Sequence, residues 1–97
     1  MLLETPYKAG DVVSMKLTSG EELIARLDEE KGTSLVLKKP LMVAVTQQGL
    51  GLAPFMFTTN PDSKITVDHS KVLCIVKSDE QFSKQYIENT RFQQLRG

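Results

Sequence analysis

The fold is decided by the stretch DVVSMKLTSGEELIARLDEEKGTSLVL, residues 11–37. Apolar and polar side chains alternate on both sides of Ser19-Gly20. The apolar positions are Val13, Met15, Leu17, Leu23, Ala25 and Leu27. A period of two is typical of a strand that buries one face, because successive side chains point to opposite sides of a sheet. With a turn at Ser19-Gly20 and an acidic loop from Glu29 to Gly32, the stretch predicts three antiparallel strands in succession.

Further strands follow the third, which starts near Ser34 and runs towards Gln47. Proline has no N–H to donate to a strand ladder, so we expect Pro40 at a bulge or bend, where a small sheet can curl into a barrel. The remaining strands are expected at 50–58, 64–68 and 71–77. The last of them is apolar on both faces, which is typical of a strand that is covered twice or pairs with another chain.

A helix is predicted at the end of the chain. Ser78 is a good N-cap, and Gln81 three residues later completes a capping-box pattern. Phe82 and Tyr86 are four positions apart and share one helical face. A chain of 97 residues predicts a single domain, with an N-terminal arm at 1–10, a barrel at 11–77 and the helix at 78–97.

The composition excludes several classes of function. Basic and acidic residues balance at 12 each, so the chain lacks the basic excess of a dedicated nucleic-acid binder. A single cysteine cannot form an internal disulfide, and the start of the chain does not resemble a signal peptide. No apolar stretch approaches the ~20 residues of a membrane span. We therefore expect a cytoplasmic protein with no membrane contact.

Catalytic chemistry is not expected. The chain has one histidine, His69, and one cysteine, Cys74, so a zinc site is not predicted and neither is any other metal or cofactor. Cys74 lies five positions beyond His69 in an apolar run, where it is expected to be a small buried hydrophobic residue rather than a nucleophile. Gly49-Leu50-Gly51 lacks the Lys-Ser or Lys-Thr of a phosphate-binding loop. The chain is therefore expected not to be an enzyme.

Two short motifs resemble those of the Sm-like family. In the first, Ser19-Gly20 matches the turn, Leu27-Asp28 matches an aromatic-Asp pair, and Ser34 stands where the family has Asn. In the second, residues 67–72 occupy the place of an apolar strand, an Arg-Gly or Lys-His pair and a short last strand. His69 resembles the histidine of the bacterial Hfq branch, and Asp68 replaces the basic residue before it.

The order of further motifs resembles small Sm-like proteins encoded by tailed bacteriophages. The matching residues are 18–22 (Thr-Ser-Gly-Glu-Glu), Pro40-Leu41, Pro54-Phe55-Met56 and Tyr86. The resemblance covers nearly the whole chain. It implies an all-β fold, a small, strongly bent, five-stranded barrel with a C-terminal α-helix.

The resemblance also implies a function. Sm-like barrels pair through their edge strands into homo-oligomeric rings, and two loops facing the pore bind single-stranded RNA by base stacking and hydrogen bonds to base edges. The counterparts of those loops are residues 28–34 and 68–71. The candidate RNA contacts are Asp28, Lys31, Ser34, His69 and Lys71. The implied function is that of an RNA-binding or RNA-chaperone ring of viral origin, acting in the host cytoplasm.

A second function stays open because several RNA determinants of the family are absent. The family's Asn is Ser34 here, its Arg-Gly pair is Asp68-His69, and the first loop has no aromatic residue. Acidic residues at 28–30 repel phosphate if they face a pore. The alternative is an oligomeric protein–protein interaction module that has lost RNA binding and binds a host or viral protein.

Overall fold

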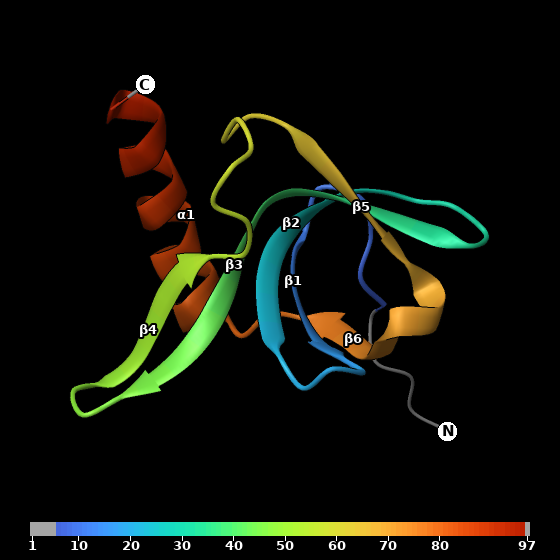
Figure 1. The fold of residues 1–97 in the computed structure, drawn as a ribbon, viewed down its shortest axis with the longest axis horizontal. Coiled ribbons are helices and arrows are strands. Elements are labelled where there is room, and N and C mark those ends of the chain that lie inside the picture. The colour runs from blue at the N-terminus through green and yellow to red at the C-terminus, as the bar shows by residue number, and fades with distance from the viewer. Residues whose placement is uncertain (1–5, 97) are drawn as a thin grey trace.

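The computed structural model describes residues 6–96, with side chains up to Arg91, and consists mostly of strands followed by one helix (Figure 1). The elements in chain order are β1 (Val12–Leu17), β2 (Glu22–Glu30), β3 (Ser34–Thr46), β4 (Gly49–Pro54), β5 (Lys64–Asp68), the 3-10 turn η1 (His69–Lys71), β6 (Val72–Lys77) and α1 (Glu80–Arg96). The predicted fold class, a bent antiparallel sheet with a C-terminal helix, is confirmed.

The strand count is six rather than five. The strands lie in the order β4-β3-β2-β1-β6, and β5 pairs separately with β3. The 13-residue strand β3 is long enough to pair with β5 through residues 34–38 and with β4 through residues 41–46. Strands β4 and β5 therefore line the same side of β3, one after the other, with residues 55–63 between them.

The strand expected at 50–58 ends at Pro54, four residues early. Proline cannot donate to a ladder, and the next N–H, of Phe55, donates instead to the carbonyl of Pro40 at 3.3 Å. A turn follows, in which the side chain of Asn60 accepts from the N–H of Asp62 at 2.8 Å. The sequence pattern predicts these two segments, 50–58 and 64–68, as separate strands, and the count of five comes only from the family resemblance.

Pro40 lies at a bulge, as the sequence predicts. Ile24 pairs with Leu41 and Arg26 pairs with Lys38, so β3 has two residues, Lys39 and Pro40, where β2 has one. Lys39 has a φ of 48°, a left-handed conformation that is uncommon for a residue with a side chain. Bulges bend a strand and increase its twist, and β3 bends here between its two partners.

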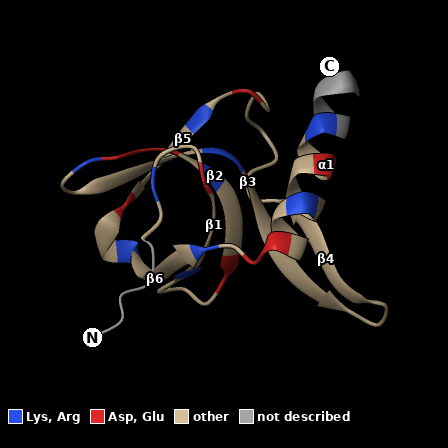
Figure 2. Ribbon diagram, turned by 180° about the vertical axis from the view of Figure 1, so that it is seen from behind, with Lys and Arg blue, Asp and Glu red and all other residues tan. Residues whose placement is uncertain are grey.

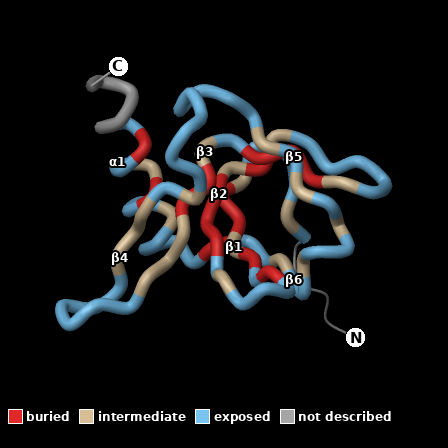
Figure 3. The backbone as a smooth tube through the Cα atoms, in the orientation of Figure 1, coloured by how far each residue is buried: buried red, intermediate tan, exposed pale blue. Residues whose placement is uncertain are grey.

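The sheet buries side chains on both faces, and Figure 3 shows buried residues along its central strands β1, β2 and β3. The inner face holds the larger core cluster, which consists of Val13, Met15, Leu17, Leu23, Ala25, Leu27, Leu35 and Leu37. Nearly all of these positions follow the alternation read from residues 11–37. The outer face holds a smaller cluster in which Tyr86 of α1 packs against Val12, Ile24 and Leu41. The helix thus packs on the sheet of its own chain.

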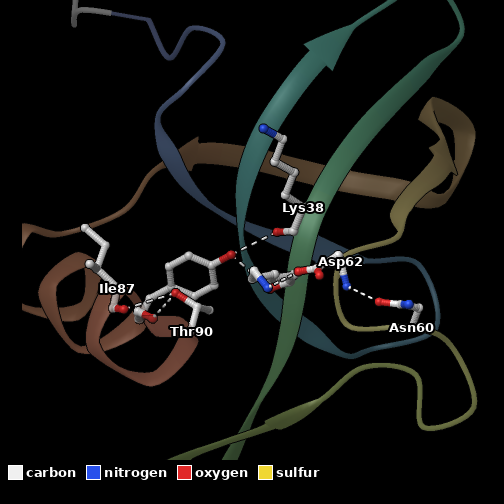
Figure 4. Close-up of polar contacts among 7 residues, drawn as sticks. Lys38, Asn60, Asp62, Ile87 and Thr90 are labelled. Atoms are coloured by element: carbon white, nitrogen blue, oxygen red, sulfur yellow. Dashed lines mark hydrogen bonds and ion pairs between the residues drawn. The ribbon is translucent and has the colours of Figure 1, made fainter. Parts of the chain in front are cut away.

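Tyr86 also satisfies the backbone groups that the bulge leaves unpaired. Its hydroxyl accepts from the N–H of Arg26 at 3.1 Å and donates towards the carbonyls of Lys38 and Lys39, each at 2.9 Å. Figure 4 shows these contacts between α1 and β3. Tyr86 is 1% exposed. Burial raises the pKa of its phenol to about 12.

The start of α1 differs from the prediction. Asp79, not Ser78, caps the helix: its side chain accepts from the N–H of Gln81 at 3.1 Å and its carbonyl accepts from the N–H of Ser83 at 2.8 Å. The hydroxyl of Ser78 is instead 2.7 Å from that of Ser14 in β1. This contact between β1 and the end of β6 is long-range and outweighs the local capping pattern. In the described chain, α1 is too short and too polar to cross a membrane.

Candidate nucleic-acid interface

The loop between β2 and β3 lies directly beside the corner between β5 and β6. The N–H of His69 donates to the carbonyl of Thr33 at 3.0 Å, and Ser34 pairs in register with Asp68. The loop itself is a tight turn closed by the N–H of Lys31, which donates to the carbonyl of Ser34 at 2.8 Å. We refer to residues 31–34 and 68–71 together as the loop–corner site.

Asp68 holds the corner in shape. Its carboxylate accepts from the N–H of Ser70 at 2.8 Å and so caps the 3-10 turn. The hydrogen bonds from Ser70 lower the pKa of Asp68, and the nearby charges of Lys71 and His69 lower it further. The acid that replaces the family's basic residue is therefore engaged with its own turn.

The side chain of His69 lies against a carboxylate at the end of β2. Its Nε2 lies 3.0 Å from Oε2 of Glu30, although the atoms are not aligned for a hydrogen bond. The Nε2 atom is buried, whereas 37% of the side chain is exposed. The same Glu30 oxygen accepts from the hydroxyl of Tyr7 at 3.1 Å. Partial burial and this bond to Glu30 raise the pKa of Tyr7.

Tyr7 and Glu30 also belong to this site, although neither was among the residues predicted from the sequence. Tyr7 lies in the arm before β1, and the arm is fastened where the N–H of Gly10 donates to the carbonyl of Leu27 at 2.7 Å. The side chain of Tyr7 packs against the inner core. The structure thus brings to the loop–corner site an aromatic residue that the first loop lacks.

Asp28 lies apart from these residues, within β2, and its side chain reaches Lys64 of β5 across β3. Its two carboxylate oxygens pair with Lys38 at 3.3 Å and with Lys64 at 3.2 Å. The hydrogen bonds from Lys64 and then Lys38 hold the pKa of Asp28 below its usual range. Two lysines therefore neutralise this acid and are themselves less available to an RNA phosphate.

The remaining predicted contacts, Lys31 and Lys71, are both exposed. Lys71 follows the corner, and its carbonyl accepts from the N–H of Thr18 in the β1–β2 turn at 2.8 Å. Of the five predicted residues, Lys31, Ser34 and His69 lie on the two adjoining loops, Lys71 ends the corner, and Asp28 belongs to a separate ion-pair cluster. Within the part of the chain that the structure describes, no three His, Cys, Asp or Glu side chains are grouped as metal ligands.

The large exposed apolar side chains lie on or near the outer strands β4 and β6. Among the described side chains, the large exposed ones near β4 are Val45, Leu50, Met56 and Phe57, and those at or just after β6 are Leu73, Val76 and Phe82. No charged residue occurs between Lys39 and Asp62, and Figure 2 shows the projecting β3–β4 hairpin without acidic or basic residues. Unprotected edges of this kind pair readily with other strands.

Cys74 was expected to be buried, and this expectation is wrong. Its thiol is free and the residue is exposed. It pairs with Lys16 of β1, on the side of β6 that no part of the described chain covers. The apolar residues on both faces of β6 predict that both faces are covered or that β6 pairs with another chain, and the described part of this chain covers one face only.

Two solved structures have a similar fold. A heptameric archaeal Sm protein matches with a TM-score of 0.51 and 17% identity, over 73% of this chain and 90% of that one. The SmAP1 heptamer of P. aerophilum matches with the same score and identity, over 73% of this chain and 82% of that one. This chain has the Sm fold. No protein-family model matches it, and no curated protein is detectably similar in sequence.

Proposed function

We propose that this Sm-like chain assembles into a homo-oligomeric ring that binds single-stranded RNA at the loop–corner site and has no enzymatic activity. The bond between the N–H of His69 and the carbonyl of Thr33 carries this proposal, because it joins the two loops that an Sm-type RNA site requires. The order of the short motifs quoted above favours a viral, bacteriophage origin, with the protein acting in the host cytoplasm.

The free edges support the ring. Strands β4 and β6 end the same five-strand path, and both leave apolar side chains exposed. A contact between two different edges of the same chain is heterologous, and repeating it generates a closed ring when the rotation closes. Both structural neighbours are described as heptamers.

A ring would also strengthen a weak site. One copy offers two exposed lysines, Lys31 and Lys71, and the first of them directly follows the acidic Glu29 and Glu30 in sequence. Repeating the same few side chains around one opening produces a surface that a single copy lacks. Tyr7 and the partly exposed His69 provide aromatic rings at this position, and base stacking on such rings contributes ~1–3 kcal/mol per base.

RNA binding is tested with fluorescent oligo(U) and oligo(A) at increasing salt. We expect binding that weakens with salt, since phosphate contacts release counterions. Lys71→Ala and His69→Ala should each weaken it, whereas Lys84→Ala on the exposed side of α1 should not. Absence of binding to both oligonucleotides at low salt would contradict the RNA proposal.

A second function, a protein-interaction ring, is favoured by a different observation. Met56 and Phe57 are 43% and 78% exposed at the rim of a pocket of about 350 Å³, which lies between the 55–63 loop and the β3 bulge. An apolar rim of this kind suits a polypeptide better than a phosphate backbone. Capture of a host or viral protein that survives nuclease treatment and is lost in Phe57→Ser would favour this function over RNA binding.

A further inference from the structure

The α1 side of the sheet is not fully covered by α1. Val45 and Leu50 lie directly opposite each other near the end of the β3–β4 hairpin and are 85% and 48% exposed. They are on the α1 side because Val45 is four positions from Leu41, which packs against Tyr86. The end of the hairpin therefore presents an apolar pair that the chain's own helix leaves open.

A second apolar pair lies at the opposite edge of the same face. Val76 near the end of β6 is 56% exposed, and Phe82 in α1 is 37% exposed. Val76 pairs with Ser14, and Ser14 pairs with Ile24 of the outer cluster, which places Val76 on the α1 side. Leu50, Val76 and Phe82 also line one groove of about 280 Å³.

We propose that α1 is part of the contact between copies: the β6–α1 junction of one copy covers the hairpin of the next, so that Val76 and Phe82 lie on Val45 and Leu50. This inference rests on the proposed ring. Only Ser78 and Asp79 separate β6 from α1, so a hairpin that pairs with the free edge of β6 also reaches the first turns of α1. In a sheet that continues from one copy to the next, side chains on the α1 side remain on the α1 side.

The charge pattern of the hairpin indicates that a second copy of the chain covers it, rather than an RNA or a charged peptide. The hairpin has no charged residue between Lys39 and Asp62, in a chain in which 25% of residues are charged. It therefore offers nothing to pair with an RNA phosphate or a charged peptide. A second copy supplies what the hairpin lacks, namely an unpaired strand edge from Val72 to Val76 without charge and an apolar pair beside it. Repetition around a ring covers every such pair.

The test places opposite charges on the two pairs. Val45→Glu and Phe82→Lys each bury an unpaired charge, and each should weaken association on the order of 100-fold. The double variant should recover at least roughly 10-fold of that loss, because the two new charges face each other across the contact between copies. Assembly is measured by light scattering and sedimentation over a range of concentrations, with circular dichroism to confirm that each variant folds. Gln48→Glu, a charge at the turn of the same hairpin, is the control and should assemble like the wild type.

The outcomes separate this inference from the proposed function. If both single variants assemble as the wild type does, α1 is outside the contact, and the ring itself stands. If the single variants dissociate and the double variant does not recover, the two pairs do not meet and the inference is overturned. If the wild type is a 10.8 kDa monomer at every concentration, the proposed ring fails, and this contact fails with it.

Discussion

Replacing Tyr86 with phenylalanine should measure how far one hydroxyl stabilises the bulge. Tyr86→Phe keeps the ring that packs on Val12, Ile24 and Leu41 and removes only the oxygen. The hydroxyl makes two hydrogen bonds at a time, since it accepts from Arg26 and has one proton to donate to Lys38 or Lys39. An unpaired buried polar group costs about 1–3 kcal/mol.

The expected loss follows from those two groups. The bonds are only partly buried, so water can replace part of the lost hydrogen bonding, and we expect a total of about 2 kcal/mol in the free energy of unfolding. For a chain of this size, such a loss lowers Tm by roughly 8–16 °C. Urea unfolding followed by circular dichroism gives the free energy, and thermal unfolding gives Tm. All variants are compared at one protein concentration, because assembly makes stability depend on concentration.

Tyr7→Phe is the matched control for this prediction. It also removes a tyrosine hydroxyl, but the bond from Tyr7 to Glu30 is exposed, so the loss should be about 0.5 kcal/mol or less. A Tyr86→Phe variant within about 0.5 kcal/mol of the wild type would refute the reasoning, since the backbone groups of the bulge would then need no partner from α1.

Three further predictions concern alkaline stability, an ion-pair cluster and a turn. Because burial raises the pKa of Tyr86 to about 12, the unfolded chain loses this proton before the folded chain does, so stability should fall as pH rises from about 10 to 12. Urea titrations at each pH should show that the free energy of unfolding falls more steeply with pH in the wild type than in Tyr86→Phe. Parallel curves for the two proteins would contradict this prediction. The pKa of Asp28 is lowered by Lys64 and Lys38, so its contribution to stability is present above the usual range of an aspartate and lost as pH falls through the lowered value. In the same measurement, the free energy of unfolding of Asp28→Asn should therefore decrease less than that of the wild type as the pH is lowered. An equal decrease in both proteins would contradict a stabilising role for the Asp28 ion pairs. Gly20 has a φ of 108° in the β1–β2 turn, so Gly20→Ala should cost about 1 kcal/mol in urea unfolding, whereas Gly32→Ala, at a position with no positive φ and open space around it, should cost less.

The features that could be predicted from the sequence depend on local pattern. The alternation in residues 11–37 identifies the inner core because side-chain direction in a strand repeats every two residues. Pro40 predicts the bulge because the missing N–H is a property of that residue alone. The family resemblance then supplies the pairing of loop and corner that places Ser34 opposite Asp68.

The features that could not be predicted depend on contacts between distant residues. Tyr7 reaches Glu30 across 23 positions, and Tyr86 reaches Arg26 across 60. Nothing in the local sequence of either tyrosine indicates these partners. The exposure of Cys74 could not be predicted from the sequence either. An apolar edge strand has the same sequence pattern whether its outer side is covered by its own chain or by another chain.

The hydroxyl of Tyr86 also has a consequence for the order of events during synthesis. The bulge is made early, at Lys39 and Pro40, but the side chain that pairs its backbone groups belongs to α1, which is synthesised after all six strands. The backbone groups at the bulge therefore lack this hydrogen-bonding partner until α1 has been synthesised and has packed on the sheet. Emergence of the strands alone therefore leaves the bulge without the partner that Tyr86 provides.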